Sequence, residues 1–330
     1  MPVDYRSAYP ADDVERRIPA TWAPAPDGNA DERGLAERVG RACARVGVDR
    51  EVVVQAVRVA IVRLARRHGS LAPQPLAYHN ESHLLELLED KLPRLIAASA
   101  LPPSARGALA LFCACHDLRQ REDGRAPEAS VGANEAASLA ETERLLDDLG
   151  LDERALRWAL RLAIIGSTFA AGTDEGDRPQ GAFAHGLAAW LDGRQPGWRD
   201  DAALRSAEHL ARVAADLDTS NVASSYVDFA QSAIALALEI QDGAGRELDS
   251  AEAGASCLAF LTDGQERYVF ELQRFASPEG RAAFAAQREA NAARVRDTAR
   301  RMRERFGGGS PPASGHEVIA AFRAMAALSQ

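Results

Sequence analysis

The residues best suited to chemistry are three of the seven histidines of this chain, which lie in two short motifs. The first motif is Tyr78-His79-Asn80-Glu81-Ser82-His83, and the second is His116-Asp117. His79 and His83 are four residues apart, so on a helix they would share one face. Two imidazoles with carboxylates form a mixed nitrogen and oxygen ligand set, which suits a catalytic divalent metal better than a structural one. A further ligand is needed, and Ala214-Ala215-Asp216-Leu217-Asp218 is the best candidate to supply it.

Helical patterns dominate the sequence that must position these motifs. Asn80 can cap a helix that carries His83, and Pro103-Ser104 opens a helix that ends at His116-Asp117. Asn134-Glu135 starts a further helix that ends at Gly150. Convincing alternating strands are absent, so the fold class is all-α. Further helices are expected to begin near 35 and 52, and to cover about 152–166, 201–217, 221–241, 246–262, 279–305 and 316–328.

The two ends of the chain differ in composition from its middle. Residues 1–30 are rich in Pro, Asp and Ala and predict a flexible N-terminal arm. Residues 307–330 contain a Gly/Pro linker, Gly307-Gly308-Gly309-Ser310-Pro311-Pro312, followed by a C-terminal amphipathic helix. Between them, 31–306 is expected to form one all-α domain. Within it, residues 170–198 are rich in Gly and Asp and predict a long loop with a short helix near 183–191.

Composition excludes several classes of function. The formal net charge of −9 argues against nucleic-acid binding through a generally basic surface. Lys91 is the only lysine and follows no Gly-rich loop, so a Walker-type phosphate loop is absent. The four cysteines form no CxxC pair and are expected to be buried thiols. No apolar run approaches about 18 residues, and the N-terminus does not read as a signal peptide, which favours a cytoplasmic protein without a membrane span.

The order of these motifs resembles the HD superfamily of metal-dependent phosphohydrolases, over about residues 50–300. The first motif has the form found in the cyclic-nucleotide phosphodiesterases of that superfamily. The resemblance implies that residues 31–306 form an HD-type, phosphodiesterase-like helical bundle. It also implies a divalent ion (Mn, Mg, Fe or Zn) held by His83, His116, Asp117 and Asp216. His79 would then be the general acid that protonates the leaving oxygen, a role that an imidazole can perform near neutral pH.

Asp216 and Asp218 compete for the last ligand position. Ala215-Asp216-Leu217 matches the Ala-Asp-Leu of phosphodiesterases, which is followed there by Ser-Asn. In this chain Asp218-Thr219 intervenes before Ser220-Asn221, so the register differs from the pattern. We favour Asp216 as the ligand and interpret Asp218 as a carboxylate at a helix end. Asn221 is assigned to substrate binding on the same resemblance.

Three further residues carry roles that the resemblance implies. Glu135 in Asn134-Glu135 resembles the Asn-Glu element of smaller bacterial HD phosphohydrolases, where it would lie near the metal-bound water and act in catalysis. The alternative is an acidic residue in the first turn of a helix, where the helix dipole favours it. Gln265 and Tyr268 match the position of a purine-binding Gln and an aromatic residue one turn later, so Gln265 could bind a base edge and Tyr268 could stack on the base.

The sequence also departs from the phosphodiesterase pattern. The run Leu118-Arg119-Gln120-Arg121 lacks the further His that supports a second metal, so one metal site is expected and a second stays open. The leading hypothesis is a phosphodiesterase that hydrolyses a cyclic nucleotide or another small phosphodiester. The alternatives are a nucleotide phosphomonoesterase and a degenerate HD domain that binds a nucleotide or a partner without turnover. The expected partner is a small phosphorylated substrate, and the oligomeric state stays open.

Overall fold

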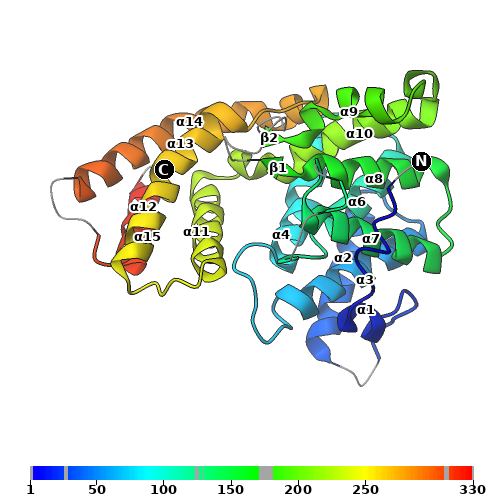
Figure 1. Ribbon diagram of the computed structural model, residues 1–330, viewed down its shortest axis with the longest axis horizontal. Coiled ribbons are helices and arrows are strands. Elements are labelled where there is room, and N and C mark those ends of the chain that lie inside the picture. Colours follow the sequence, from blue (N-terminus) through cyan, green and yellow to red (C-terminus); the bar gives the residue numbers. More distant parts are fainter. Residues whose placement is uncertain are drawn as a thin grey trace. The chain divides into compact units, whose positions relative to one another are not determined.

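The computed structural model describes residues 3–25, 29–122, 126–128, 130–170, 181–307 and 312–328. In these ranges the chain is predominantly helical, as the sequence predicts, and the one strand pair joins β1 (Phe169–Ala170) to β2 (Gly181–Ala182) (Figure 1). No helix within these ranges is long and apolar enough to cross a membrane. The α-helices are α1 (Asp13–Arg17), α2 (Ala30–Arg45), α3 (Glu51–His68), α4 (Glu81–Glu86), α5 (Leu92–Ala97), α6 (Pro103–Cys115), α7 (Ala133–Asp148), α8 (Arg154–Ser167), α9 (Leu187–Arg194), α10 (Ala202–Asp218), α11 (Tyr226–Gly243), α12 (Ala251–Ala259), α13 (Gln265–Arg267), α14 (Pro278–Phe306) and α15 (Gly315–Leu328).

Shorter helical turns join several of these helices. Three are π-helical, at Leu87–Lys91, Phe260–Gly264 and Tyr268–Leu272. Three are 3₁₀ turns, at Phe183–His185, Trp198–Asp200 and Thr219–Ala223. The short helix expected near 183–191 is present as a 3₁₀ turn followed by α9, whereas residues 171–180 of the expected long loop lie outside the described residues.

The helices form two compact units. The first unit comprises Met1–Asp218 with Ala276–Ala283, and the second comprises Thr219–Phe275 with Phe284–Gln330. This division cuts through the single 31–306 domain expected from the sequence. The boundary falls directly after α10, and the early part of α14 returns to the first unit.

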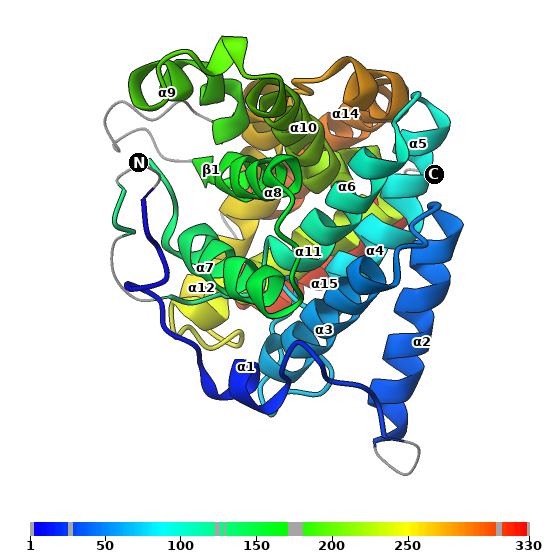
Figure 2. The same cartoon turned by 90° about the vertical axis from the view of Figure 1, so that its right-hand side faces the viewer.

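The core of the first unit is built around α3 and α6. Every residue of α6 from Ala108 to Cys115 is buried, and so is every residue of α3 from Val59 to Ala65. A helix that is apolar around its whole circumference has to be surrounded by other helices. Accordingly, α6 packs against α3 and α8, α3 packs against α2, and α8 makes its most extensive contact with α10 (Figure 2).

The N-terminal segment is part of the first unit, which corrects the expectation of a flexible arm. The Tyr5 side chain is fully buried, and its hydroxyl donates to Glu128 at 2.9 Å. The Asp12 side chain caps α1 and accepts from Arg67 of α3 at 2.7 Å. Compositional bias towards Pro and Asp does not reveal this packing, because it depends on partners far away along the chain.

The second unit encloses its own apolar core. α12 and α15 pack together and both contact α11 (Figure 1). Val318 and Phe322 of α15 are buried there with Phe229 of α11 and Cys257 of α12. The C-terminal helix therefore belongs to this core and is not an appended element. Residues 308–311 of the expected linker lie outside the described residues.

Candidate metal centre

The first histidine motif spans the start of α4. The Asn80 side chain accepts a hydrogen bond from the Ser82 backbone N–H at 2.8 Å, so it caps the helix as the sequence predicts. The amide nitrogen of Asn80 donates in turn to the Leu76 carbonyl at 2.8 Å, which fixes the preceding loop. His83, in the first turn of α4, is 7% exposed. Directly after α4 the chain widens into the π-helical turn Leu87–Lys91, a feature often found beside functional sites.

α6 delivers the second motif, because the helix ends at Cys115 and His116-Asp117 follows. The Nδ1 atom of His116 lies 3.2 Å from the Phe112 carbonyl oxygen. A carbonyl can only accept, so Nδ1 carries the proton and donates. The His116 ring also stacks on Phe112, with ring centroids 4.8 Å apart. These two contacts fix the ring with Nε2 near the carboxylates of Asp117 and Asp218, as the outer partners of metal-ligating histidines usually orient the ring.

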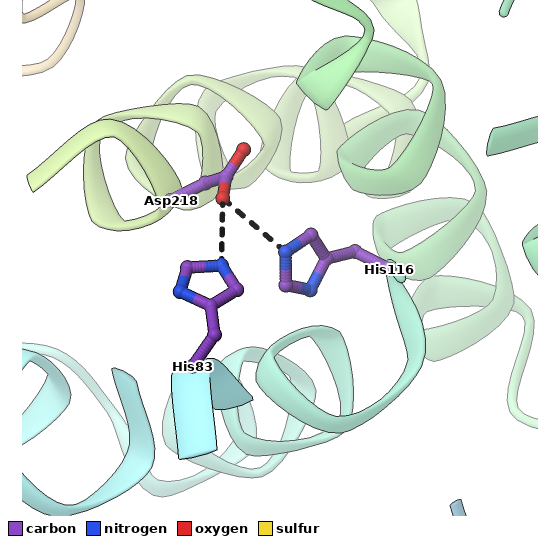
Figure 3. A group of neighbouring side chains, drawn as sticks. All are labelled: His83, His116 and Asp218. Atoms are coloured by element: carbon purple, nitrogen blue, oxygen red, sulfur yellow. Dashed lines mark ion pairs between the residues drawn. The ribbon is translucent and has the colours of Figure 1, made fainter. Parts of the chain in front are cut away.

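The third element is the end of α10, whose last residue is Asp218. Asp218 Oδ1 lies 3.6 Å from His83 Nε2 and 3.2 Å from His116 Nε2 (Figure 3). Asp117 Oδ2 approaches the same two nitrogens at 3.7 and 3.2 Å. Figure 3 shows both imidazoles pointing towards one oxygen of Asp218. The cluster His83–His116–Asp117–Asp218 is called the metal cluster below.

The spacing of these atoms fits a divalent ion. With bonds of about 2.1 Å, two ligand atoms at a right angle lie about 3.0 Å apart, and two at the tetrahedral angle lie about 3.4 Å apart. The four nitrogen-to-oxygen separations, from 3.2 to 3.7 Å, lie within or close to that spread. His116 Nε2 is buried and makes no hydrogen bond, although two carboxylates are near. The ligand atoms of His83, His116 and Asp218 therefore lie close together, within 4.8 Å of one another, and Asp117 Oδ2 approaches the same two imidazoles.

The imidazoles and carboxylates of the metal cluster shift one another's pKa values. Burial lowers the pKa of His116, but the carboxylates of Asp117 and Asp218 outweigh it and raise the pKa well above its ordinary value. Burial raises the pKa of Asp117, but the three nearby imidazoles, with His116 first, bring the pKa well below its usual range. Asp218 likewise has a lowered pKa despite its burial, chiefly because of His116. Both carboxylates are thus ionised at neutral pH, as metal ligands must be.

Asp216 does not reach the metal cluster, which corrects the sequence-based preference for it over Asp218. Its Oδ1 accepts from the Ala276 backbone N–H at 2.6 Å, and its Oδ2 accepts from the N–H and hydroxyl of Ser277 at 2.7 and 2.5 Å. Burial raises the pKa of this carboxyl to about 6, although these hydrogen bonds oppose the shift. A side chain on Gly280 would collide with it, since a Cβ there would lie 2.2 Å from Oδ2. Asp216 therefore ties the end of α10 to the start of α14.

His79 and Glu135 lie beside the metal cluster without belonging to it. The ring centroids of His79 and His83 are 6.5 Å apart, and the imidazole of His79 lowers the pKa of both Asp117 and Glu135 electrostatically. Glu135 is in the first turn of α7, and burial raises the pKa of its carboxyl to about 7. The structure thus brings a third imidazole and a third carboxyl close to the four candidate ligands.

Two amides that the sequence argument did not select also reach this region. Gln120 Nε2 donates to Asp117 Oδ1 at 2.9 Å, and Asn134 Nδ2 donates to Gln120 Oε1 at 2.9 Å. Gln120 follows His116-Asp117 by a few residues, but nothing in the pattern distinguishes it from a solvated loop residue. The sequence points to Asn134 only indirectly, as the neighbour of Glu135 in the Asn-Glu element.

The residues assigned to substrate binding are found in the second unit. Tyr268 donates from its hydroxyl to Asn221 Oδ1 at 3.1 Å, so these two side chains are in direct contact. Gln265, one turn before Tyr268, is buried. The metal cluster, by contrast, is formed entirely by the first unit. The role of the three residues in binding a nucleotide stays a prediction.

A second group of acids, Asp12, Glu15 and Glu141, also comes close together. Arginine side chains compensate these carboxylates. Arg67 bonds to Asp12 and Glu141, Arg144 bonds to Glu15, and Arg63 bonds to Glu141. Such pairing compensates the charges of the buried Glu15 and Glu141 and of the half-buried Asp12, so we interpret this group as an ion network that fixes the N-terminal segment.

Comparisons with known proteins add no relative: no protein-family model matches the chain, and no curated protein matches its sequence. The functional argument therefore depends on the residues of the metal cluster and its surroundings.

Proposed function

We propose that this protein is a metal-dependent phosphohydrolase of the HD type that hydrolyses a small phosphodiester, most concretely a cyclic nucleotide. The observation that carries the proposal is the convergence of His83, His116, Asp117 and Asp218, with His79 and Glu135 beside them. Nitrogen and carboxylate ligands in this combination favour a catalytic divalent ion over a structural one.

Each residue near the cluster has a distinct task in this proposal. The two imidazoles and the two aspartates would hold the ion, which supplies Lewis acidity by acidifying water and offsetting negative charge on phosphoryl oxygens. His79 lies close enough to the cluster to give a proton to the leaving oxygen and need not touch the ion. Burial raises the pKa of the Glu135 carboxyl to about 7, so this group could accept a proton from an attacking water near neutral pH.

The choice of a phosphodiester depends on the resemblance of the Tyr78–His83 motif to that of phosphodiesterases. The choice of a nucleotide depends on Asn221, Gln265 and Tyr268. Asn221, Gln265 and Tyr268 lie outside the metal cluster, and the Tyr78–His83 motif shares only His83 with it. The choice of substrate can therefore fail while the metal-dependent hydrolysis remains.

The proposal is tested first by metal content. Protein freed of metal with a chelator is titrated with Mn²⁺, Mg²⁺, Fe²⁺ and Zn²⁺, and bound metal is measured by elemental analysis. We expect about one ion per chain. His83→Ala and Asp218→Ala should lose this ion, because each removes a ligand atom. Asp216→Ala should still bind the ion at saturating metal, although it should unfold at a lower temperature because α14 loses its anchor.

The second test measures turnover on bis(p-nitrophenyl) phosphate, p-nitrophenyl phosphate and a panel of cyclic nucleotides and nucleoside monophosphates. Metal-dependent hydrolysis of the diesters is the expected result. Hydrolysis of monoesters alone would replace the proposal by a phosphomonoesterase. Metal binding without turnover of any substrate would indicate a binding domain. A protein that takes up none of the four ions, or an Asp216→Ala variant that loses the ion while Asp218→Ala retains it, would contradict the proposed centre.

A further inference from the structure

A chain of three hydrogen bonds leads from Asp117 away from the metal cluster. Gln120 Nε2 donates to Asp117 Oδ1 at 2.9 Å. Asn134 Nδ2 donates to Gln120 Oε1 at 2.9 Å, and the Glu122 backbone N–H donates to Asn134 Oδ1 at 3.0 Å. The pair Gln120–Asn134 is called the amide relay below.

The direction of the amide relay is determined by the backbone. A backbone N–H can only donate, so the Asn134 atom that faces Glu122 must be the amide oxygen. The amide nitrogen of Asn134 then faces Gln120, which must present its own oxygen. Gln120 is left with its amide nitrogen towards Asp117. Neither amide can flip without placing two donors or two acceptors against each other.

As a result, the two carboxylate oxygens of Asp117 have different partners. Oδ1 accepts from Gln120, whereas Oδ2 faces His116 and His83 at 3.2 and 3.7 Å. A carboxylate held by one oxygen cannot rotate freely about its Cβ–Cγ bond. The ligand oxygen is therefore kept in one orientation, ready for an ion.

The relay also connects Asp117 to α7. Asn134 and Glu135 are adjacent in the first turn of this helix. The same turn therefore orients Asp117 through Asn134 and carries the carboxyl of Glu135, whose pKa is raised. A second tie lies one turn further along α7, where the Ser138 hydroxyl accepts from the Arg119 backbone N–H at 3.0 Å. Ser138 holds the same loop but does not touch the Asp117 carboxylate.

We propose that Gln120 and Asn134 are positioning residues for metal binding, which act on the ion through Asp117 and do not contact it. This inference rests on the proposed metal centre. Partners of this kind tune the orientation of a ligand, and their loss typically weakens metal affinity about 10-fold to 100-fold.

The test uses two variants and Co²⁺, which is titrated into metal-free protein and followed by its visible absorption and by competition with a chelator. Gln120→Ala removes the donor to Asp117 and should weaken Co²⁺ binding about 10-fold to 100-fold. Asn134→Asp is almost isosteric and touches no ligand. The new carboxylate would still accept from Glu122 but would draw the amide nitrogen of Gln120 towards itself. Gln120 would then turn its oxygen to Asp117, and Co²⁺ binding should weaken by a similar factor.

The Asn134→Asp variant separates the relay from simple charge. By charge alone, an added carboxylate should tighten cation binding. The relay predicts the opposite result, weaker binding, because Gln120 would present its oxygen to the Asp117 carboxylate. Whether a loss of stability by itself weakens metal binding is measured with Ser138→Ala.

Two matched controls complete the experiment. Ala133→Asp adds the same charge one residue away and outside the relay, so Co²⁺ affinity should be unchanged or higher. Ser138→Ala removes the other tie to α7, so it should lower the unfolding temperature but keep the affinity, measured well below that temperature. Affinities of Gln120→Ala and Asn134→Asp within about twofold of the parent protein, while His83→Ala abolishes binding, would overturn the relay and leave the proposed function standing. A parent protein that binds neither Co²⁺ nor the four ions above would overturn both.

Discussion

Single atoms decide what the metal cluster can bind. The hydrogen bond from His116 Nδ1 to Phe112 leaves Nε2 as the inward nitrogen, and the amide relay leaves Oδ2 of Asp117 as the inward oxygen. Asp218 completes the cluster with Oδ1. For His116 and Asp117, the inward atom is selected by an outer partner that binds the other polar atom of the same side chain. Substitution of such partners should therefore alter the centre although they contact neither ion nor substrate.

His79 should be separable from the ligands by its effect on turnover. His79→Ala is expected to retain its metal, because the ring lies outside the four candidate ligands, but to lose about 10²-fold to 10⁴-fold in kcat. The loss should be much smaller for a substrate with a p-nitrophenolate leaving group, since a good leaving group needs little protonation. Steady-state kinetics on an aryl and an alkyl diester of the same phosphate compare the two cases. Equal losses on both would show that His79 positions the substrate and does not donate a proton.

Whole elements are held in place around the cluster by polar contacts over long sequence distances. The end of α10 is tied to the start of α14 through Asp216, and this contact directs Asp218 to the other side of the helix. The N-terminal segment is fixed to α3 and α7 by the ion network of Asp12, Glu15 and Glu141 with their arginines. Such networks are costly to break on one side, because removal of one charge leaves its partner buried and uncompensated.

Asp12 offers a measurable test of the N-terminal anchor. Hydrogen bonds and charge from Arg67 outweigh its burial and lower its pKa from 3.8 to about 2. Because the pKa of Asp12 is lower in the folded than in the unfolded protein, ionisation of this carboxyl stabilises the fold at pH values above the unfolded-state pKa. This contribution is lost as the pH falls from 3.8 towards about 2. Asp12→Asn should thus lower the free energy of unfolding by about 2 kcal/mol at neutral pH.

The difference in free energy of unfolding between Asp12→Asn and the parent protein should become smaller as the pH drops to about 3, because the parent carboxylate then begins to take up a proton. Urea unfolding at neutral pH and at about pH 3 measures this difference. Asp13→Asn is a matched control, since Asp13 is an exposed neighbour that forms an ion pair with Arg16 on the same helix. It should change the free energy by less than about 1 kcal/mol. A deficit for Asp12→Asn that does not change between the two pH values would contradict the assigned ionisation.

At the scale of the whole molecule, the proposed functional residues are divided between two units. The metal cluster, His79 and Glu135 belong to the first unit, whereas Asn221, Gln265 and Tyr268 belong to the second. The second unit has a core of its own, to which α15 contributes Val318 and Phe322. The roles proposed for the two groups of residues can therefore be tested separately, by substitution in one unit or the other.

Tyr268 is the best residue for the test of recognition. If it stacks on a base, Tyr268→Ala should cost about 1–3 kcal/mol of nucleotide affinity, seen mainly in KM. Hydrolysis of bis(p-nitrophenyl) phosphate, which has no base, should be unchanged because the metal cluster is intact. Tyr268→Phe keeps the ring but loses the hydroxyl contact with Asn221, so it should retain most of the affinity. Parent-like kinetics of Tyr268→Ala on every nucleotide would remove this residue from recognition and favour a simpler phosphomonoesterase.

The helical architecture and the principal histidines follow from local sequence. Apolar periodicity indicates α3, α6 and α10, and Asn80 caps α4 as expected from its side chain. These features depend on neighbours within one or two turns, which a single sequence displays directly. The same local logic places His83 in the first turn of α4 and His116 directly after α6.

The choice between Asp216 and Asp218 depended on tertiary structure. Asp216 and Asp218 are two residues apart, so on an α-helix their side chains point in directions about 200° apart. Only one of the two carboxylates can therefore face the imidazoles. Which one does so is set by Ala276 and Ser277, about sixty residues away along the chain. The amide relay and the anchored N-terminal segment are equally non-local, because Asn134 and Arg67 meet their partners only after the helices have packed. Sequence patterns specify what each helix can present, whereas the packing of helices selects the atoms that converge.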